Sequence, residues 1–268
     1  MSTYTQCWQV KLLIILVRIP NFKLSFMKHL MILLVSSLSL SALAQGENED
    51  PSFSSSADLK ITNTSIVYDN RLEQLIFTIE TQGLAGKSVP SAFGQMNGAP
   101  VLGYVFPTTL QPTDVGFSDT EGILALAITS HPDFDDTPLW DEDNDRNYAN
   151  DGVIWHPHWV VLVEDSRVPG GLAVKQFDPS NNNVTLPPTN PGMPMFMDSP
   201  GYPIITKGST IRVVVPAYRM NNQTQFNFDA VTAYMQVNAS NPAYPMLGVY
   251  AVYSVASGDL SLPYSVSR

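Results

Sequence analysis

From residue 59 almost to its end, the chain alternates short apolar, β-branched runs with Gly, Pro, Asn and Asp, which limits it to folds made of β-strands. The runs show hardly any of the 3.6-residue periodicity of amphipathic helices. The predicted strands cover residues 59–68, 72–80, 101–106, 123–129, 153–163, 172–177, 210–215, 226–237 and 247–255. We therefore expect an all-β fold, a single antiparallel β-sandwich over residues 58–268, with jelly-roll or immunoglobulin-like strand order left open.

The connections between these runs carry the turn-forming residues. Most of the 21 prolines fall there, which predicts long Pro- and Asn-rich loops at the ends of the sandwich. The short join at residues 68–72, with Asp69 and Asn70 between two apolar runs, predicts a tight hairpin.

The first 44 residues have the composition of an export signal. Residues 27–29 are a short basic start, residues 30–40 are apolar, and Ala42 and Ala44 form the small-x-small pattern of a cleavage site. We expect a signal peptide at 27–44, an upstream segment at 1–26 that belongs to a misplaced start, and a flexible polar lead-in at 45–57. The protein is accordingly predicted to be periplasmic or secreted, with no membrane insertion after cleavage.

Removing residues 1–44 leaves 224 residues, a length that one all-β domain can fill. It also removes four basic residues and no acidic one, so the remainder carries ten basic and 24 acidic side chains, a net charge of −14. Such a chain repels nucleic acid and favours cations. Because Cys7 is the only cysteine and lies upstream of the cleavage site, disulfides and thiolate chemistry are excluded.

The stretch 140–164 is the strongest candidate site, because an acidic loop runs directly into a strand with His156 and His158. Alternation along that strand assigns every second residue to the core face, namely Trp155, Pro157, Trp159, Val161 and Val163. The two histidines therefore share the other face with Val160, Leu162 and Glu164. Pro157 cannot donate a ladder hydrogen bond, which predicts an edge strand or a bulge at this point.

A third histidine, His131, follows the run 123–129. If that run pairs antiparallel with the strand at 153–163, the end of the first meets the start of the second, and His131 lies beside His156 and His158. Three neutral imidazoles, assisted by Asp133 or a water, suit zinc or copper(II). The alternative is that each histidine satisfies a local hydrogen bond at a loop end.

The acidic loop predicts a separate, oxygen-lined site. Its alternate positions carry potential calcium ligands, with Asp151 or Asp136 as an additional one. These positions are Asp141, Asp143, Asp145 and Asn147. Arg146 and Gly152 stand where an EF-hand needs Gly and Glu, so a simpler calcium loop or a solvated turn is expected.

A Pro-rich loop carries Met193, Met195 and Met197 at alternate positions. Thioethers with this spacing on an extended segment point the same way, and soft sulfur selects copper(I). Methionine also fills gaps under loops, which is the alternative interpretation.

Three functions are consistent with these features. The preferred one is an exported protein that holds copper or zinc through His131, His156 and His158, next to the calcium-type loop, with Met193, Met195 and Met197 as candidate assisting ligands. The second is a calcium-stabilised module that binds a glycan or another small ligand, with Trp140, Trp155 or Trp159 as a stacking face. The third is a metal-dependent enzyme with Glu164 or Asp133 as base. It ranks last, since no recognisable base lies within reach of the histidines. No catalytic residue is assigned, and the oligomeric state is left open.

Overall fold

The structure is a computed structural model that describes residues 53–91, 95–132 and 154–268. These residues form antiparallel β-strands and three single-turn 3₁₀ helices, η1 (Ala57–Leu59), η2 (Pro112–Val115) and η3 (Ala217–Met220). The all-β prediction is confirmed.

A four-stranded antiparallel sheet forms one layer. Its order is β1 (Ile61–Asp69), β2 (Gln74–Thr81), β9 (Thr210–Pro216) and β8 (Ile204–Lys207). The predicted hairpin joins β1 and β2, where Asp69 Oδ1 accepts hydrogen bonds from the backbone N–H groups of Arg71 and Leu72 at 2.9 and 3.2 Å. Those bonds hold the turn and lower the pKa of the Asp69 carboxyl.

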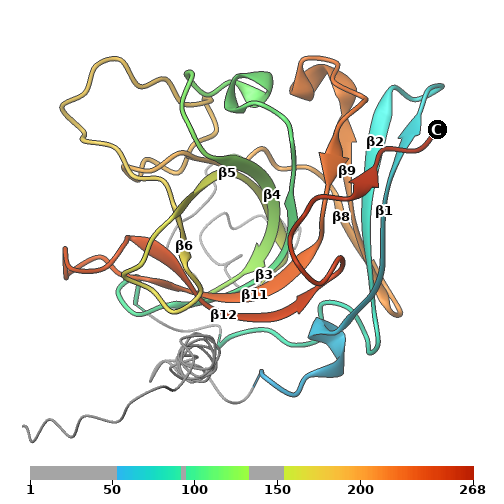
Figure 1. Ribbon diagram of the computed structural model, residues 1–268, viewed down its shortest axis with the longest axis horizontal. Helices are drawn as coiled ribbons and strands as arrows, with labels where there is room; N and C mark the ends of the chain where they lie inside the picture. The colour runs from blue at the N-terminus through green and yellow to red at the C-terminus, as the bar shows by residue number, and fades with distance from the viewer. Residues whose placement is uncertain (1–52, 92–94, 133–153) are drawn as a thin grey trace, which may run out of the picture. The chain divides into compact units, whose positions relative to one another are not determined.

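The larger sheet closes on itself as a barrel of six strands. Its consecutive members are β3 (Pro100–Pro107), β4 (Ile123–Ser130), β5 (His156–Glu164), β6 (Leu172–Val174), β12 (Leu247–Val255) and β11 (Val231–Val237). Pairing of β4 with β5 completes the ring, which Figure 1 shows nearly end-on. The sandwich prediction did not include this closure. Closing the ring leaves no free edge between β4 and β5.

All nine predicted runs contain strands, and three short strands were not predicted: β7 (Met197–Asp198), β8 and β13 (Tyr264–Ser265). The run 226–237 divides into β10 (Asn227–Phe228) and β11. The break falls at buried Asp229, whose carboxylate accepts hydrogen bonds from the backbone N–H groups of Ala230 and Ser257.

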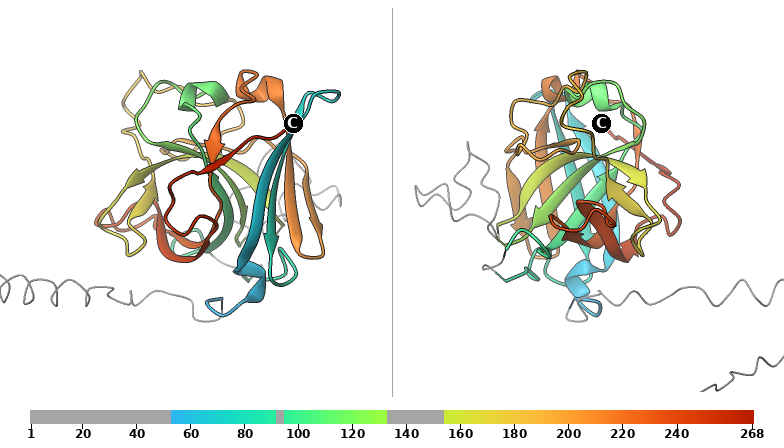
Figure 2. Two further views of the ribbon diagram at one scale, coloured as in Figure 1. Left: turned by 45° about the vertical axis from the view of Figure 1, so that its right-hand side comes forward. Right: turned by 90° about the vertical axis from the view of Figure 1, so that its left-hand side faces the viewer.

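One hydrophobic core lies between the four-stranded sheet and the outer wall of the barrel. Figure 2 shows that sheet standing along one side of the barrel. Phe77 of β2 packs edge-on against Phe106 and Trp159 of the barrel, with ring centroids 5.3 and 6.4 Å apart. These aromatic contacts bind the two layers together.

A second core, formed by aliphatic side chains, lines the inside of the barrel. The predicted alternation along β5 is confirmed, because Trp159 and Val161 belong to the core between the layers and Val160 and Leu162 to the barrel interior. Both faces of β5 are therefore buried.

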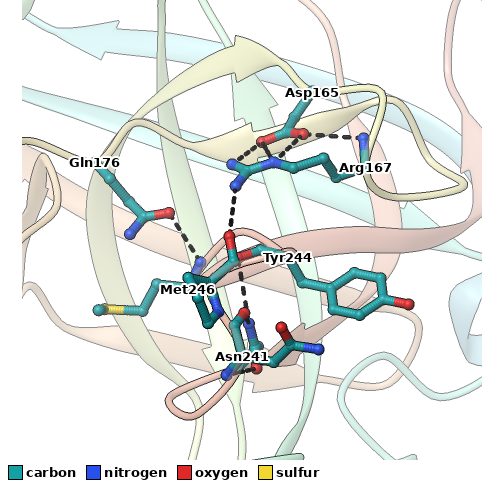
Figure 3. A network of polar contacts seen from close by, with 8 residues as sticks. Asp165, Arg167, Gln176, Asn241, Tyr244 and Met246 are labelled. Carbon is teal, nitrogen blue, oxygen red and sulfur yellow. Dashed lines mark hydrogen bonds and ion pairs between the residues drawn. The ribbon is translucent and has the colours of Figure 1, made fainter.

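Loops on the β5–β6 and β11–β12 connections are tied to one another. Figure 3 shows the exposed Asp165–Arg167 ion pair of the β5–β6 connection, 2.6 Å between N and O; Arg167 also donates to Pro242 O in the β11–β12 connection at 3.5 Å. Beside it, Met246 N donates to Oε1 of Gln176, which lies beyond β6, at 3.0 Å. In the β5–β6 connection, Gly170 N donates to Val249 O of β12, and a Cβ on Gly170 would lie 2.5 Å from that oxygen. Only glycine permits this close approach.

Candidate metal centre

Strands β4 and β5 bring the three histidines together as predicted. The two strands pair without a register shift, and Thr129 stands opposite His156. His131 follows directly after the end of β4, so its ring reaches the two imidazoles that project from β5. The ring centroids of His131 and His156 are 4.6 Å apart, and those of His156 and His158 are 4.8 Å apart.

One potential ligand nitrogen from each ring lies within 4.8 Å of the others, an arrangement that could hold a metal ion. The nearest pair is Nε2 of His131 and Nε2 of His156, which are 2.8 Å apart. Two nitrogens bound to one tetrahedral zinc ion at about 2.0–2.1 Å are separated by about 3.3 Å. The three nitrogens thus lie at separations on both sides of the value that one zinc ion requires.

Each histidine has its Nδ1 in a hydrogen bond with a neighbouring group. Nδ1–H of His131 donates to Pro132 O at 2.8 Å, and Nδ1–H of His156 donates to Ile154 O at 2.7 Å. A carbonyl oxygen can only accept, so these bonds place the proton of both neutral rings on Nδ1 and the lone pair on Nε2. Metal-binding histidines are commonly oriented in this way.

The third imidazole is oriented by a residue that the sequence did not single out. Nδ1 of His158 lies 2.9 Å from Oγ of Ser199, which follows directly after β7. Ser199 is 41 residues from His158 in sequence. No local pattern in the chain indicates this contact, because it depends on the pairing of β7 with β5.

The three histidines are all buried, and burial sets their electrostatics. Burial lowers the pKa of His156 well below its ordinary value, and charge on His131 and His158 would lower it further. For His158, burial and the charge on His131 lower the pKa to about 3, although a hydrogen bond that the ring donates to the backbone carbonyl of Asp198 acts to raise it. The rings of His156 and His158 are therefore neutral at pH 7, the form that binds metal.

The methionine loop lies beside this cluster. His131, His158 and Thr129 line one small cavity together with the three methionines Met193, Met195 and Met197. The methionines were predicted as assisting ligands, but no local pattern indicates the contact, since Met193 lies 29 residues beyond the end of β5. It brings thioether sulfur to the same end of the barrel as the imidazoles.

Pro157 pairs with Ile128 of β4, and β7 joins the opposite side of β5 only from Trp159 onward. The described strands β4 and β5 pair regularly, without the predicted bulge. The first part of β5, which pairs with β4 alone, is an edge as predicted.

The other predicted site residues are distributed differently. Asp133, Asp136, Asp141, Asp143, Asp145, Asn147, Asp151 and Trp140 lie outside the described residues. Trp155 and Trp159 are both buried in the core between the layers. Glu164 is exposed at the far end of β5 from the histidines, six residues beyond His158, or about 20 Å along a strand.

Comparisons with known proteins give no relative for this chain: no family model, no curated protein and no solved structure matches it. Within the described parts of the chain, no helix has the length and apolar character needed to cross a membrane. Function is therefore inferred from the site itself.

Proposed function

We propose that this protein is an exported metal-binding protein that holds one copper or zinc ion through His131, His156 and His158. The observation that carries the proposal is the 2.8 Å contact between Nε2 of His131 and Nε2 of His156. Both rings have their Nδ1–H directed at a backbone carbonyl. Two nitrogen lone pairs consequently face each other at hydrogen-bonding distance.

Such a contact needs a cation between the two nitrogens, because two lone pairs repel. A proton can serve, but it places a charged imidazolium in a buried site, where burial lowers the pKa of His156. A metal ion satisfies both nitrogens and adds His158 as a third ligand. A proton between the rings contacts two nitrogens, whereas a metal ion can bind a nitrogen from all three rings.

The choice between copper and zinc depends on the ligands. Three neutral imidazoles suit zinc or copper(II). The three methionines that line the same cavity favour copper(I) if one of their sulfur atoms binds. The expected export signal and the charge of −14 after its removal fit a protein that meets cations outside the cytoplasm. Calcium binding by the acidic loop is a separate part of the proposal.

The two other functions have less support. Trp155 and Trp159 are 8% and 0% exposed, so neither offers the stacking face that a glycan needs. An enzyme with an open metal position requires a base, and exposed Glu164 stands at the opposite end of β5.

Elemental analysis tests the proposal. The mature protein is purified from its export compartment without chelators or a His tag, alongside His156→Ala/His158→Ala. An Asn181→Ala/Asn183→Ala variant, altered in an exposed loop, serves as the matched control. We expect one copper or zinc ion per chain in the wild type and the control, and none in the histidine variant, with far-UV circular dichroism unchanged in all three. Calcium alone, equal in all three proteins, would contradict the histidine site.

A further inference from the structure

The metal proposal does not use a second feature of the barrel, an apolar cavity in its interior. The cavity has a volume of about 90 Å³, measured as the space open to the centres of water molecules. All the empty space between its lining atoms, including the open mouth, amounts to about 830 Å³. A six-stranded barrel is narrow, and barrels of up to about eight strands are ordinarily filled by their own side chains. This interior is not filled.

The space arises because small residues stand at the middle of the barrel wall. Ala127 of β4 and Ala233 of β11 both line the cavity. Gly103 of β3 pairs with Ala233, and a Cβ at Gly103 would lie 2.8 Å from Cε of Met235. Larger side chains at these positions would remove the space.

The lining chemistry is almost uniform. Among the described residues that line the cavity, none is Asp, Glu, Lys or Arg and none is Phe, Tyr or Trp. The side chains that carry hydrogen-bonding groups are Thr129 and His158, and both stand at one end, because Ala127 pairs with His158 whereas Ile123 pairs with Leu162. A cavity with such walls stays dry and accepts apolar molecules.

The opposite end is the mouth. Ile123, Val252 and Leu260 line the cavity there and are 40%, 43% and 38% exposed. The segment after β12 begins at this end. Val255, the last residue of β12, pairs with Val231, the first residue of β11, and Val231 pairs with Val105 near the end of β3. The end of β3 in turn pairs with the first part of β4, where Ile123 stands.

Two leucines of that segment, Leu260 and Leu262, line the mouth in left-handed backbone conformations, φ +59° and +54°. Side chains with a Cβ rarely adopt this region, so the surroundings must hold them there. Ser257 Oγ does so in part, since it accepts the Leu260 N–H at 3.0 Å. Strained residues of this kind gather at ligand clamps.

We infer that the barrel interior is a binding site for a small aliphatic molecule, an alkyl chain with one hydrogen-bonding end group. The chain lies between the aliphatic walls, its end group reaches Thr129, and it enters past Leu260 and Leu262. The inference does not depend on a metal ion, because the walls alone select the chain.

Calorimetric titration of the mature full chain with 1-hexanol, 1-heptanol and 1-octanol tests this site. Each added methylene that enters the cavity is expected to raise affinity about fourfold. Ala233→Leu fills the middle of the cavity and should weaken 1-octanol binding at least tenfold. The matched control, Ala239→Leu, changes an exposed residue and should leave binding unchanged. Equal 1-octanol affinity in the wild type and Ala233→Leu would overturn the inference, as would absence of binding to the wild type.

NMR of the wild type with bound 1-octanol tests the same site if Ala233→Leu does not fold. Nuclear Overhauser contacts are expected between the 1-octanol chain and the methyl groups of Ala127 and Ala233, with the carbinol end nearest Thr129. Contacts confined to residues outside the barrel would overturn the inference. A protein that binds 1-octanol here but no transition metal would sustain this site and contradict the metal proposal, so the two can fail separately.

Discussion

At the scale of single residues, the two ring nitrogens of each histidine differ in their partners. Nδ1 of His131 and of His156 is fixed by a backbone carbonyl, and Nδ1 of His158 lies against Ser199. The remaining nitrogens are then available to a shared ion. Partners of this kind orient the ring and raise its basicity as a ligand, so they contribute to metal affinity without touching the metal.

Ser199→Ala tests this contribution. Removing Oγ leaves His158 as a ligand but frees its ring to rotate, so we expect zinc or copper affinity to fall about 10- to 100-fold with the stoichiometry unchanged. Competition with a chromophoric chelator measures the affinity. The control is Ser240→Ala, an exposed serine whose Oγ bonds Asn97. Equal affinities in Ser199→Ala and Ser240→Ala would show that Ser199 has no part in the site.

Acid should destabilise the metal-free protein through His156 and His158. Their pKa values are lowered in the folded state, so the unfolded chain binds more protons below its ordinary histidine pKa of about 6.5. This contribution to stability is complete above about pH 6.5. It is lost as the pH falls toward about 3, the pKa of folded His158. The expected slope is roughly 1 kcal/mol per pH unit for each histidine.

Urea unfolding at pH 7.5, 5.5 and 4.5 measures this slope in wild type and in His156→Gln/His158→Gln. Carboxylates contribute to both proteins alike, so the difference between the two isolates the histidines. The wild type should lose more free energy of unfolding than the variant across this range. Parallel pH profiles would be inconsistent with neutral, buried imidazoles.

At the scale of elements, the pairing of β4 with β5 was the part of the site that the sequence could predict. Period-two alternation placed His156 and His158 on one face, and antiparallel pairing of neighbouring runs brought His131 beside them. Strand positions were equally accessible, since every predicted run contains a strand. These features depend on local patterns.

The remaining features depend on contacts between distant segments. Ser199 and the methionine loop reach the histidines because the two-residue strand β7 pairs with β5, and two residues are too few to give a periodic signal. Closure of the barrel also follows from the order of strands in space, which alternation does not specify. The cavity exists because Ala127 and Ala233 have small side chains, and an alanine in a strand does not by itself indicate a cavity.

Phe77 of β2 couples the two layers, and its removal should affect stability and not the metal centre. Its ring is fully buried against Phe106, Trp159 and Phe226. We expect Phe77→Ala to lower the free energy of unfolding by about 3–5 kcal/mol. Metal stoichiometry of the folded protein should be unchanged. Denaturant unfolding measures the loss, and Leu72→Ala in the exposed hairpin turn, with a 63% exposed side chain, is the control. A loss equal to that of the control would contradict the role of Phe77.

At the scale of the whole molecule, closure of the sheet explains why both faces of β5, the strand that carries His156 and His158, are buried. One face of β5 packs toward the four-stranded sheet, and the other lines the barrel interior. The histidines and methionines gather at one end of that interior, and the mouth lined by Leu260 stands at the other. The two cavities share Thr129, His158, Met197 and Leu247. The barrel therefore has a polar end with three histidines and an apolar cavity in one interior.

The most direct test of the metal centre is a crystal of the metal-loaded mature protein, with diffraction recorded on both sides of the zinc or copper absorption edge. The account predicts one anomalous peak inside the barrel, about 2.0–2.1 Å from a ring nitrogen of each of His131, His156 and His158. No peak among the three rings, or a peak confined to residues 133–153, would contradict it.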